Sequence, residues 1–373
     1  MATIILYPIS DVQLAHTCSS GSSGYLMIDD PQNSPDDAST TIYNTSSGSQ
    51  GDSSNKTSIF KMSATSPYTN KKVYITGISY RVRHQRTNNG SSSDGSVKIA
   101  ASINGGNYTE GSSHSVSQSW TNSNASLSPS GLNQTYNTFS DAEIRARVYT
   151  SATQGKNGSV NTYVTQVYFE ATYLPYFNFA VGGRIGCTAS VSASEAKQGD
   201  NVTFTATPNS GYRFIGWYSD SSYTTLVSSN TSYQVAASTD TTLYAKALRV
   251  CTVTVHGSDH FTASVSPSSG VEGDVCVATA THSTGIASFD GWFSDAACTQ
   301  RVYPYTTYEI KLASSDIELW VGSTLRFGLY HKINGQWVLM NKVYRKENGV
   351  WVIKENPDQI MSTDVKYIDR TQQ

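Results

Sequence analysis

The chain has 373 residues, and its 26 lysine and arginine residues against 28 aspartate and glutamate residues give a formal net charge of −2 at pH 7. Charged residues make up 14% of the chain, below the roughly 25% that is usual in soluble domains. A chain this close to neutrality has no strong field to attract nucleic acid or an anionic membrane surface, so we expect neither as a partner.

Residues 1–176 predict an antiparallel β-sandwich of jelly-roll-like type. Apolar residues alternate with polar ones, which marks strands with one buried and one solvated face. Antiparallel sheets tolerate this pattern, and two sheets stacked face to face bury both apolar faces. The long loops rich in glycine, serine and asparagine either bind a ligand or cover a neighbouring subunit. The alternating runs are Val97, Ile99, Ala101; Ala142, Ile144, Ala146, Val148; and Tyr163, Thr165, Val167, Phe169, Ala171, Tyr173.

Residues 184–247 and 248–324 contain one sequence unit twice. Gly216-Trp217-Tyr218-Ser219-Asp220 returns as Gly291-Trp292-Phe293-Ser294-Asp295, and the flanking segments match as well. A unit that returns at a fixed spacing is the mark of repeated modules that are each built the same way. We therefore expect two small β repeats, joined to the first domain by a short connector over residues 177–183.

Residues 325–373 predict two β-hairpins and a tail. Each hairpin has an Asn-Gly turn, the strongest short-range hairpin signal because both turn residues need positive φ. Trp337 and Trp351 each follow one of these turns. A two-sided hairpin offers little core, so we expect these two tryptophans to contact a partner protein or a glycan.

Catalytic and metal-binding patterns are absent from the sequence. No GxSxG, HExxH or phosphate-binding glycine loop occurs, and Glu143 and Glu170 lie on predicted strands with an outward phase. His256 and His260 flank an aspartate, but zinc usually needs further ligands at defined spacing, which favours a solvated turn. We therefore expect neither enzymatic activity nor a cofactor.

Four aspartates flank a proline-containing turn early in the chain, and oxygen-rich loops of this kind can hold Ca²⁺. Because they lack EF-hand spacing, an exposed turn is the favoured interpretation, and an acid that pins the rim of the sandwich is the alternative. The four residues are Asp29, Asp30, Asp36 and Asp37.

The five cysteines are expected to be thiols. The N-terminus has no basic segment followed by an apolar stretch, so the sequence indicates synthesis in the cytoplasm without a signal peptide. Disulfides are rare in that compartment, although a Cys251–Cys276 bridge is the alternative. No apolar run reaches the roughly 18 residues that a membrane helix needs.

The repeat pattern resembles the Listeria–Bacteroides repeat, a small β-grasp-like module of internalin-type surface proteins. The resemblance implies that the aromatic positions form the core of each repeat, rather than platforms on which sugars stack. The core residues it implies are Phe214, Trp217 and Tyr233 in the first copy, and Phe289, Trp292 and Tyr308 in the second. The remaining matching residues are Gly216, Tyr218, Leu243 and Tyr244, and Gly291, Phe293, Leu319 and Trp320.

Two further segments resemble proteins of tailed bacteriophages. The tyrosine-rich strand over residues 164–173 looks like part of a virion β-sandwich, and the tandem hairpins look like C-terminal segments of tail and appendage proteins from Gram-positive hosts. These resemblances imply a non-enzymatic structural protein of the virion: a capsid decoration, head fibre or tail appendage. Its expected partners are other virion proteins, further copies of itself and a host-surface glycan. The alternative is a bacterial cell-surface adhesin or carbohydrate-binding protein.

Overall fold

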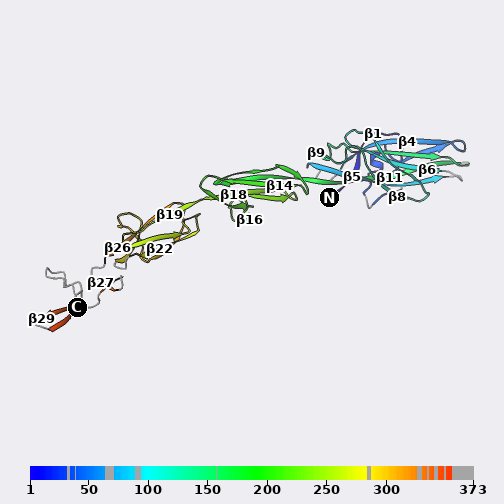
Figure 1. Cartoon of the computed structure of the whole chain (residues 1–373). Coiled ribbons are helices and arrows are strands. Elements are labelled where there is room, and N and C mark those ends of the chain that lie inside the picture. The colour runs from blue at the N-terminus through cyan, green and yellow to red at the C-terminus, as the bar shows by residue number, and fades with distance from the viewer. Residues whose placement is uncertain are drawn as a thin grey trace. The chain divides into compact units, whose positions relative to one another are not determined.

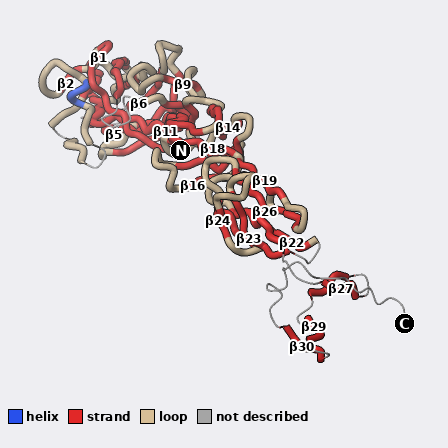
Figure 2. Tube along the Cα trace, turned by 90° about the vertical axis from the view of Figure 1, so that its left-hand side faces the viewer, coloured by secondary structure: helices blue, strands red, loops and turns tan. Residues whose placement is uncertain are grey.

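The computed structural model describes residues 1–31, 34–37, 39–63, 71–88, 94–156, 158–283, 287–325, 330–333, 336–339, 343–347 and 350–354, and these confirm the predicted all-β fold. Figure 2 shows the described segments as strands and loops apart from one helical turn, η1 (Tyr25–Met27). No helix among them is long and apolar enough to cross a membrane. The chain forms two compact units: Met1–Val181, Val191–Thr205 and Ser232–Thr242; and Gly182–Ser190, Ala206–Thr231 and Leu243–Gln373.

The first unit contains the predicted antiparallel sandwich (Figure 1). Strand β1 belongs to both of its sheets, because its first residues pair with β11 and its last residues pair with β4. The first sheet contains β1 (Ala2–Gln13), β2 (Thr17–Cys18), β3 (Ile42–Ser47), β5 (Val73–Asn88), β8 (Thr121–Leu127), β9 (Gln134–Tyr136) and β11 (Ser159–Ile185). The second contains β1, β4 (Ser53–Ser63), β10 (Arg145–Thr153), β6 (Asp94–Ser102) and β7 (Thr109–Ser115).

Both sheets contribute to one apolar core. Val97, Ile99 and Ala101 are fully buried on β6, as their alternation predicts, and Tyr80 and Phe169 are fully buried on the facing sheet. Burying a side chain of the size of valine, isoleucine or phenylalanine contributes about 1.5–3 kcal/mol to the free energy of folding. The period of two therefore located the inner face of these strands correctly.

The long run on β11 departs from a strict period of two. The pairing of β11 with β5 shifts between Val164 and Gln166, so Thr165 is an extra residue in a β-bulge. A bulge reverses the face that the following residues present. Val164 on one side of the bulge and Val167 on the other are both buried, whereas Tyr163 is half-buried. Placing Tyr163 on the same face as Val167 was therefore wrong.

Two sequence predictions of local structure are also corrected. Residues 177–183, which were expected to be a separate short connector, are part of β11, because this strand continues without a break to Ile185. Alternation persists past Pro175, and Tyr176 gains a new partner in Lys197 on β13 (Glu195–Lys197). Glu143 lies in a turn at φ 41°, before β10 begins, and not on a strand.

The first repeat contributes strand pairs to each unit. In the first unit, β14 (Asn201–Pro208) pairs with β17 (Ser232–Ala236). In the second, β15 (Tyr212–Tyr218) pairs with β16 (Leu226–Ser228) and with β18 (Thr241–Arg249). The other two strands between residues 186 and 247 are β12 (Cys187–Val191) and β13, which pairs with β11.

The second repeat consists of two β-sheets (Figure 1), and Trp292 is buried in its core. Its first and last strands, β19 and β26, pair in parallel, and its other pairs are antiparallel. One sheet has the order β21 (Ser269–Gly270), β19 (Cys251–His256), β26 (Ile317–Leu325), β23 (Ala287–Phe293), β24 (Arg301–Tyr303). The other has the order β20 (Phe261–Ser266), β22 (Val275–His282), β25 (Thr307–Lys311).

The two predicted C-terminal hairpins are present. β27 (Tyr330–Ile333) pairs with β28 (Gln336–Leu339), and β29 (Val343–Glu347) pairs with β30 (Val350–Lys354). Their Asn-Gly turns lie outside the described residues. Trp337 lies in β28 and Trp351 in β30; the contacts of their side chains also lie outside the described part of the chain.

Candidate functional site

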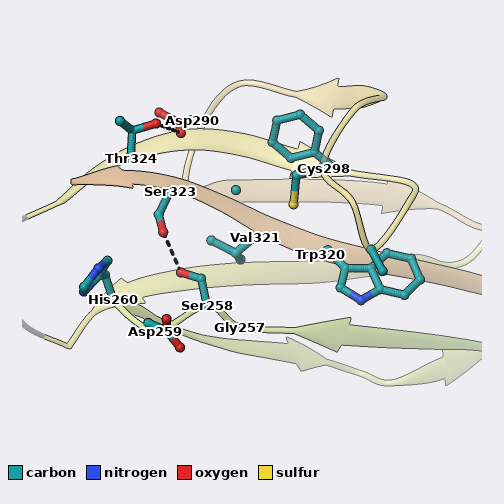
Figure 3. Close-up of a pocket in the computed structure, with 13 residues that line it drawn as sticks. Gly257, Ser258, Asp259, His260, Asp290, Cys298, Trp320, Val321, Ser323 and Thr324 are labelled. Carbon is teal, nitrogen blue, oxygen red and sulfur yellow. Dashed lines mark hydrogen bonds between the residues drawn. The ribbon is translucent and has the colours of Figure 1, made fainter.

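An open depression of about 660 Å³ lies beside β26 in the second repeat. Strand β19 ends at His256, whereas its parallel neighbour β26 continues to Leu325. The lining comes from the loop that follows β19, residues 257–260, from the far part of β26, residues 320–324, and from Asp290, Phe293, Ala296 and Cys298. The site thus occupies the part of β26 that β19 leaves uncovered (Figure 3).

The aromatic part of the site is Trp320. Its neighbours Leu319 and Val321 point into the core, so Trp320 lies on the opposite face of β26 and is half-buried. The His256 ring stacks on the indole with the centroids 4.9 Å apart and the planes at 12°. His256 Nε2 in turn lies 2.7 Å from Oε1 of Glu318. This row of stacked and hydrogen-bonded groups fixes the orientation of the indole at the edge of the depression.

The polar part of the site consists of hydroxyls and carboxylates. Ser258 Oγ and Ser323 Oγ are hydrogen-bonded at 2.9 Å, and Thr324 Oγ1 donates to Asp290 Oδ2 at 2.5 Å. In Figure 3, Asp290 and Asp259 lie on opposite sides of the serine pair, and Trp320 lies at the other end. Serine hydroxyls donate and accept, and carboxylates accept. An apolar ring beside such groups suits a ligand that combines an apolar face with several hydroxyls.

A rigid turn holds Cys298 in the lining. The Asp295 carboxylate accepts the backbone N–H of Thr299 at 3.0 Å and that of Gln300 at 2.7 Å, and these bonds lower its pKa. Cys298 has φ 52° within this turn. Burial, followed by the charges of Asp295 and Asp290, raises the pKa of the Cys298 thiol. The thiol therefore stays protonated at neutral pH and lacks the thiolate that a nucleophile requires.

The aromatic residues that the repeat resemblance assigned to the core have different environments. Trp217 and Trp292 are both fully buried. Phe214 and Phe289 are half-buried and meet them edge to face, with centroids 5.9 and 6.2 Å apart. The remaining two, Tyr233 and Tyr308, are half-buried, and the Tyr308 ring stacks on Tyr303 at 4.3 Å.

Sequence reasoning missed Trp320 as a site residue, because it appeared only as one position in the repeat match. The signal that was available in the sequence is Gly322, two residues after Trp320. The first repeat has a large side chain, Lys246, two residues after the matching Tyr244. The two histidines considered as metal ligands diverge: His256 pairs with Glu318, while His260 lines the depression. Within the described part of the chain, no group of three or more histidine, cysteine or acidic residues could hold a metal ion.

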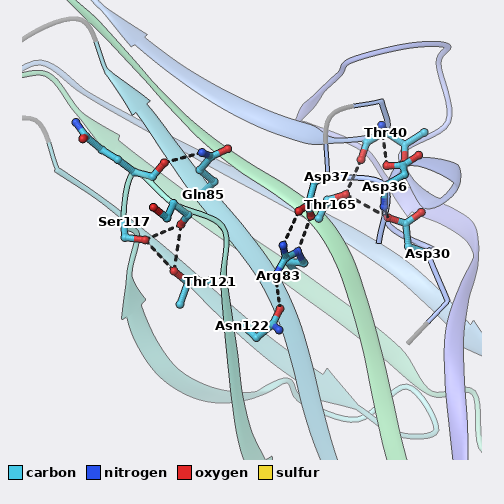
Figure 4. A network of polar contacts seen from close by, with 12 residues as sticks. Asp30, Asp36, Asp37, Thr40, Arg83, Gln85, Ser117, Thr121, Asn122 and Thr165 are labelled. Carbon is cyan, nitrogen blue, oxygen red and sulfur yellow. Dashed lines mark hydrogen bonds and ion pairs between the residues drawn. The ribbon is translucent and has the colours of Figure 1, made fainter. Parts of the chain in front are cut away.

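The acidic loop of the sandwich is clamped by internal partners (Figure 4). Arg83 on β5 donates from Nε and Nη2 to the two carboxylate oxygens of Asp37, at 2.5 Å each. Thr165, the extra residue of the β-bulge, donates to Asp30 at 3.2 Å. Asp36 accepts from Thr40 Oγ1 at 2.6 Å. Burial raises the pKa of both Asp29 and Asp30. Asp30 and Asp37 therefore fasten the loop to the sandwich, and Asp36 holds the loop together internally.

Comparison with known proteins supports the repeat. A model of the divergent InlB B-repeat domain matches residues 178–246, which confirms the predicted resemblance of this segment to internalin-type repeats. The comparison with curated proteins gave no match.

Two solved structures are loosely similar. The carbohydrate-binding module TmCBM61, solved in complex with β-1,4-galactotriose, is 9% identical with a TM-score of 0.18, over 35% of this chain and 70% of that one. The glycoside hydrolase domain of Endo-D from Streptococcus pneumoniae R6 is 12% identical with a TM-score of 0.19, over 73% of this chain and 33% of that one. Scores this low assign no ligand.

Proposed function

We propose that this chain is a non-enzymatic adhesion protein that binds a carbohydrate at the depression of the second repeat. The observation that carries the proposal is the fixed Trp320 ring beside two serine hydroxyls and two aspartates. A sugar ring has an apolar face that packs on an aromatic ring, and hydroxyls that exchange hydrogen bonds with such groups. The volume of the site falls within the ~300–1,000 Å³ of small-molecule sites.

The charge of the lining narrows the ligand class. Asp259 and Asp290 contribute carboxylates, and the lining contains neither lysine nor arginine. An anionic sugar would bring like charges together inside a partly desolvated site, which costs free energy. The ligand class is therefore a neutral saccharide, or one that carries an amino group.

The test is a binding measurement on the full chain. An array of neutral, amino and acidic oligosaccharides selects a ligand, and titration calorimetry then gives its affinity. Trp320→Ala is expected to weaken binding at least 10-fold, about 1.4 kcal/mol. The matched control is Tyr305→Ala, which removes an exposed ring of the same repeat, 68% accessible, that does not line the site. Unchanged affinity in Trp320→Ala would refute the site.

A finer proposal concerns where such adhesion takes place. We infer from the phage-like sequence segments that the protein is a virion component, which displays the repeats and docks, as an oligomer, on other virion proteins. Mass spectrometry of purified phage particles should detect peptides of this chain. Recovery from bacterial wall extracts, and not from particles, would favour a cell-surface adhesin.

A further inference from the structure

The two repeats share the turn that borders the site. In the first repeat, the Asp220 carboxylate accepts the N–H of Thr225 at 2.7 Å, as Asp295 accepts that of Gln300. The residue three positions after each aspartate has a positive φ without being glycine: 56° at Tyr223 and 52° at Cys298. The two turns therefore have the same backbone, and these two side chains occupy equivalent positions.

The pairing of the neighbouring strands fixes the other equivalences. Tyr218 pairs with Tyr244 in the first repeat as Phe293 pairs with Trp320 in the second. Two residues after Tyr244 on β18, Lys246 pairs with Gly216. Two residues after Trp320 on β26, Gly322 pairs with Gly291. Tyr244 thus corresponds to Trp320, and Lys246 corresponds to Gly322.

In the first repeat, the Tyr223 ring packs over this face. It meets Tyr218 and Tyr244 edge to face, with centroids 5.7 and 6.1 Å apart, and Lys246 Nζ lies 5.9 Å from its centroid. A Cβ added to Gly183 would lie only 3.1 Å from the Tyr223 hydroxyl. The half-buried Tyr223 ring therefore covers part of this face of the first repeat.

The second repeat has no counterpart of the Tyr223 ring or of the Lys246 amine on this face. Cys298 stands where the first repeat has Tyr223, and Gly322 stands where it has Lys246. Phe293 packs directly over Gly322, leaving no room for a side chain there. Cys298, Gly322 and Trp320 all line the depression. The hollow thus lies where the first repeat places Tyr223.

We infer that the residue at this turn position decides whether a repeat binds the ligand, so that Cys298 leaves the second repeat open and Tyr223 closes the first. This inference rests on the proposed carbohydrate binding and deepens it, because it assigns one site to the chain where the repeat pattern alone would suggest two. The first repeat then acts as a spacer with the same scaffold.

The central variant is Cys298→Tyr in the full chain. Tyr223 already shows that this backbone accepts tyrosine, so we expect the variant to fold. The neutral oligosaccharide selected from the array should bind the unmodified chain at one site and bind Cys298→Tyr at least 10-fold more weakly. Cys298→Ser, the matched control, keeps a small side chain and should retain affinity within about twofold. Full affinity in Cys298→Tyr, or two equal sites in the unmodified chain, would overturn the inference.

A second measurement works without any sugar. A soluble nitroxide should broaden the Trp320 indole N–H signal in the unmodified chain and broaden it less in Cys298→Tyr, because the added ring covers the hollow. Trp320→Phe identifies the signal. Equal broadening in the two proteins would overturn the inference whether or not a sugar binds. If sugar binding fails while the broadening differs, the proposed function falls and the closure by tyrosine stands.

Discussion

Truncation of Trp292 is the sharpest test of the second-repeat core. Its ring is fully buried and meets Phe289 edge to face. An aromatic side chain of this kind buries about 150–250 Å², which at ~25 cal/mol per Å² corresponds to roughly 4–6 kcal/mol. This is an upper value, since unfolded chains already bury part of their surface. Trp292→Ala also leaves a cavity, and we expect it to lower the free energy of unfolding of the repeat by about 3–5 kcal/mol.

The assay must follow the repeat itself, because a chain of several modules does not unfold in one two-state step. Native-state hydrogen exchange, read by mass spectrometry on peptides from residues 251–325, reports the local free energy of opening. Trp320→Ala is the control: it removes a half-buried ring of the same type and should cost about 1 kcal/mol or less. A loss below about 1 kcal/mol in Trp292→Ala would refute the assignment of this ring to the core.

The remaining predictions concern pH and the loop clamp. Burial and the charge of Lys56 lower the pKa of His16 from 6.5 to about 3. The unfolded chain then binds the extra proton first, so the stability of the sandwich that is present above pH 6.5 should fall progressively towards pH 3. The free energy of opening of the sandwich, read by the same exchange assay, should depend less on pH in His16→Gln, and an unchanged slope would contradict this. Backbone N–H donors lower the pKa of Asp220 to about 2. The protection of the amides in its turn, measured as the exchange rate relative to that of an unstructured peptide at the same pH, should therefore fall as the pH falls from about 4 towards 2. This protection should not change with pH over that range in Asp220→Asn. Arg83→Lys loses the two-point pairing with Asp37 and should increase exchange in residues 34–41, while Arg145→Lys should not.

Sequence patterns predicted the strands and hairpins correctly where a single local rule, such as apolar alternation or an Asn-Gly turn, determines the structure. The alternation of Val97, Ile99 and Ala101 located a buried face, and the two Asn-Gly turns located the C-terminal hairpins. The sequence could not reveal the bulge at Thr165, because an extra residue is defined by the register of the partner strand, β5. Nor could it show that β11 runs through Pro175, because the new partner, β13, lies about twenty residues further along the chain.

The candidate site was harder to predict for a related reason. Trp320 belongs to the same sequence pattern as Tyr244, and nothing in the pattern distinguishes a covered position from an open one. The difference arises from Cys298 and Gly322, which lie apart in the sequence and come to line one depression only in the folded repeat. A residue-by-residue comparison of the two copies could have found the site. The signal is a position at which one copy has a large side chain and the other has a small one.

The most direct test of carbohydrate binding uses the six tryptophans of the chain as reporters. Indole N–H signals are recorded for the full chain, assigned by single replacements, and followed while the neutral oligosaccharide selected from the array is added. Binding at the second repeat predicts a saturable shift of the Trp320 signal, while Trp217 and Trp292 stay nearly unchanged. A shift confined to Trp337 or Trp351 would place the site on the C-terminal hairpins, and this result, or no shift at any tryptophan, would contradict the account.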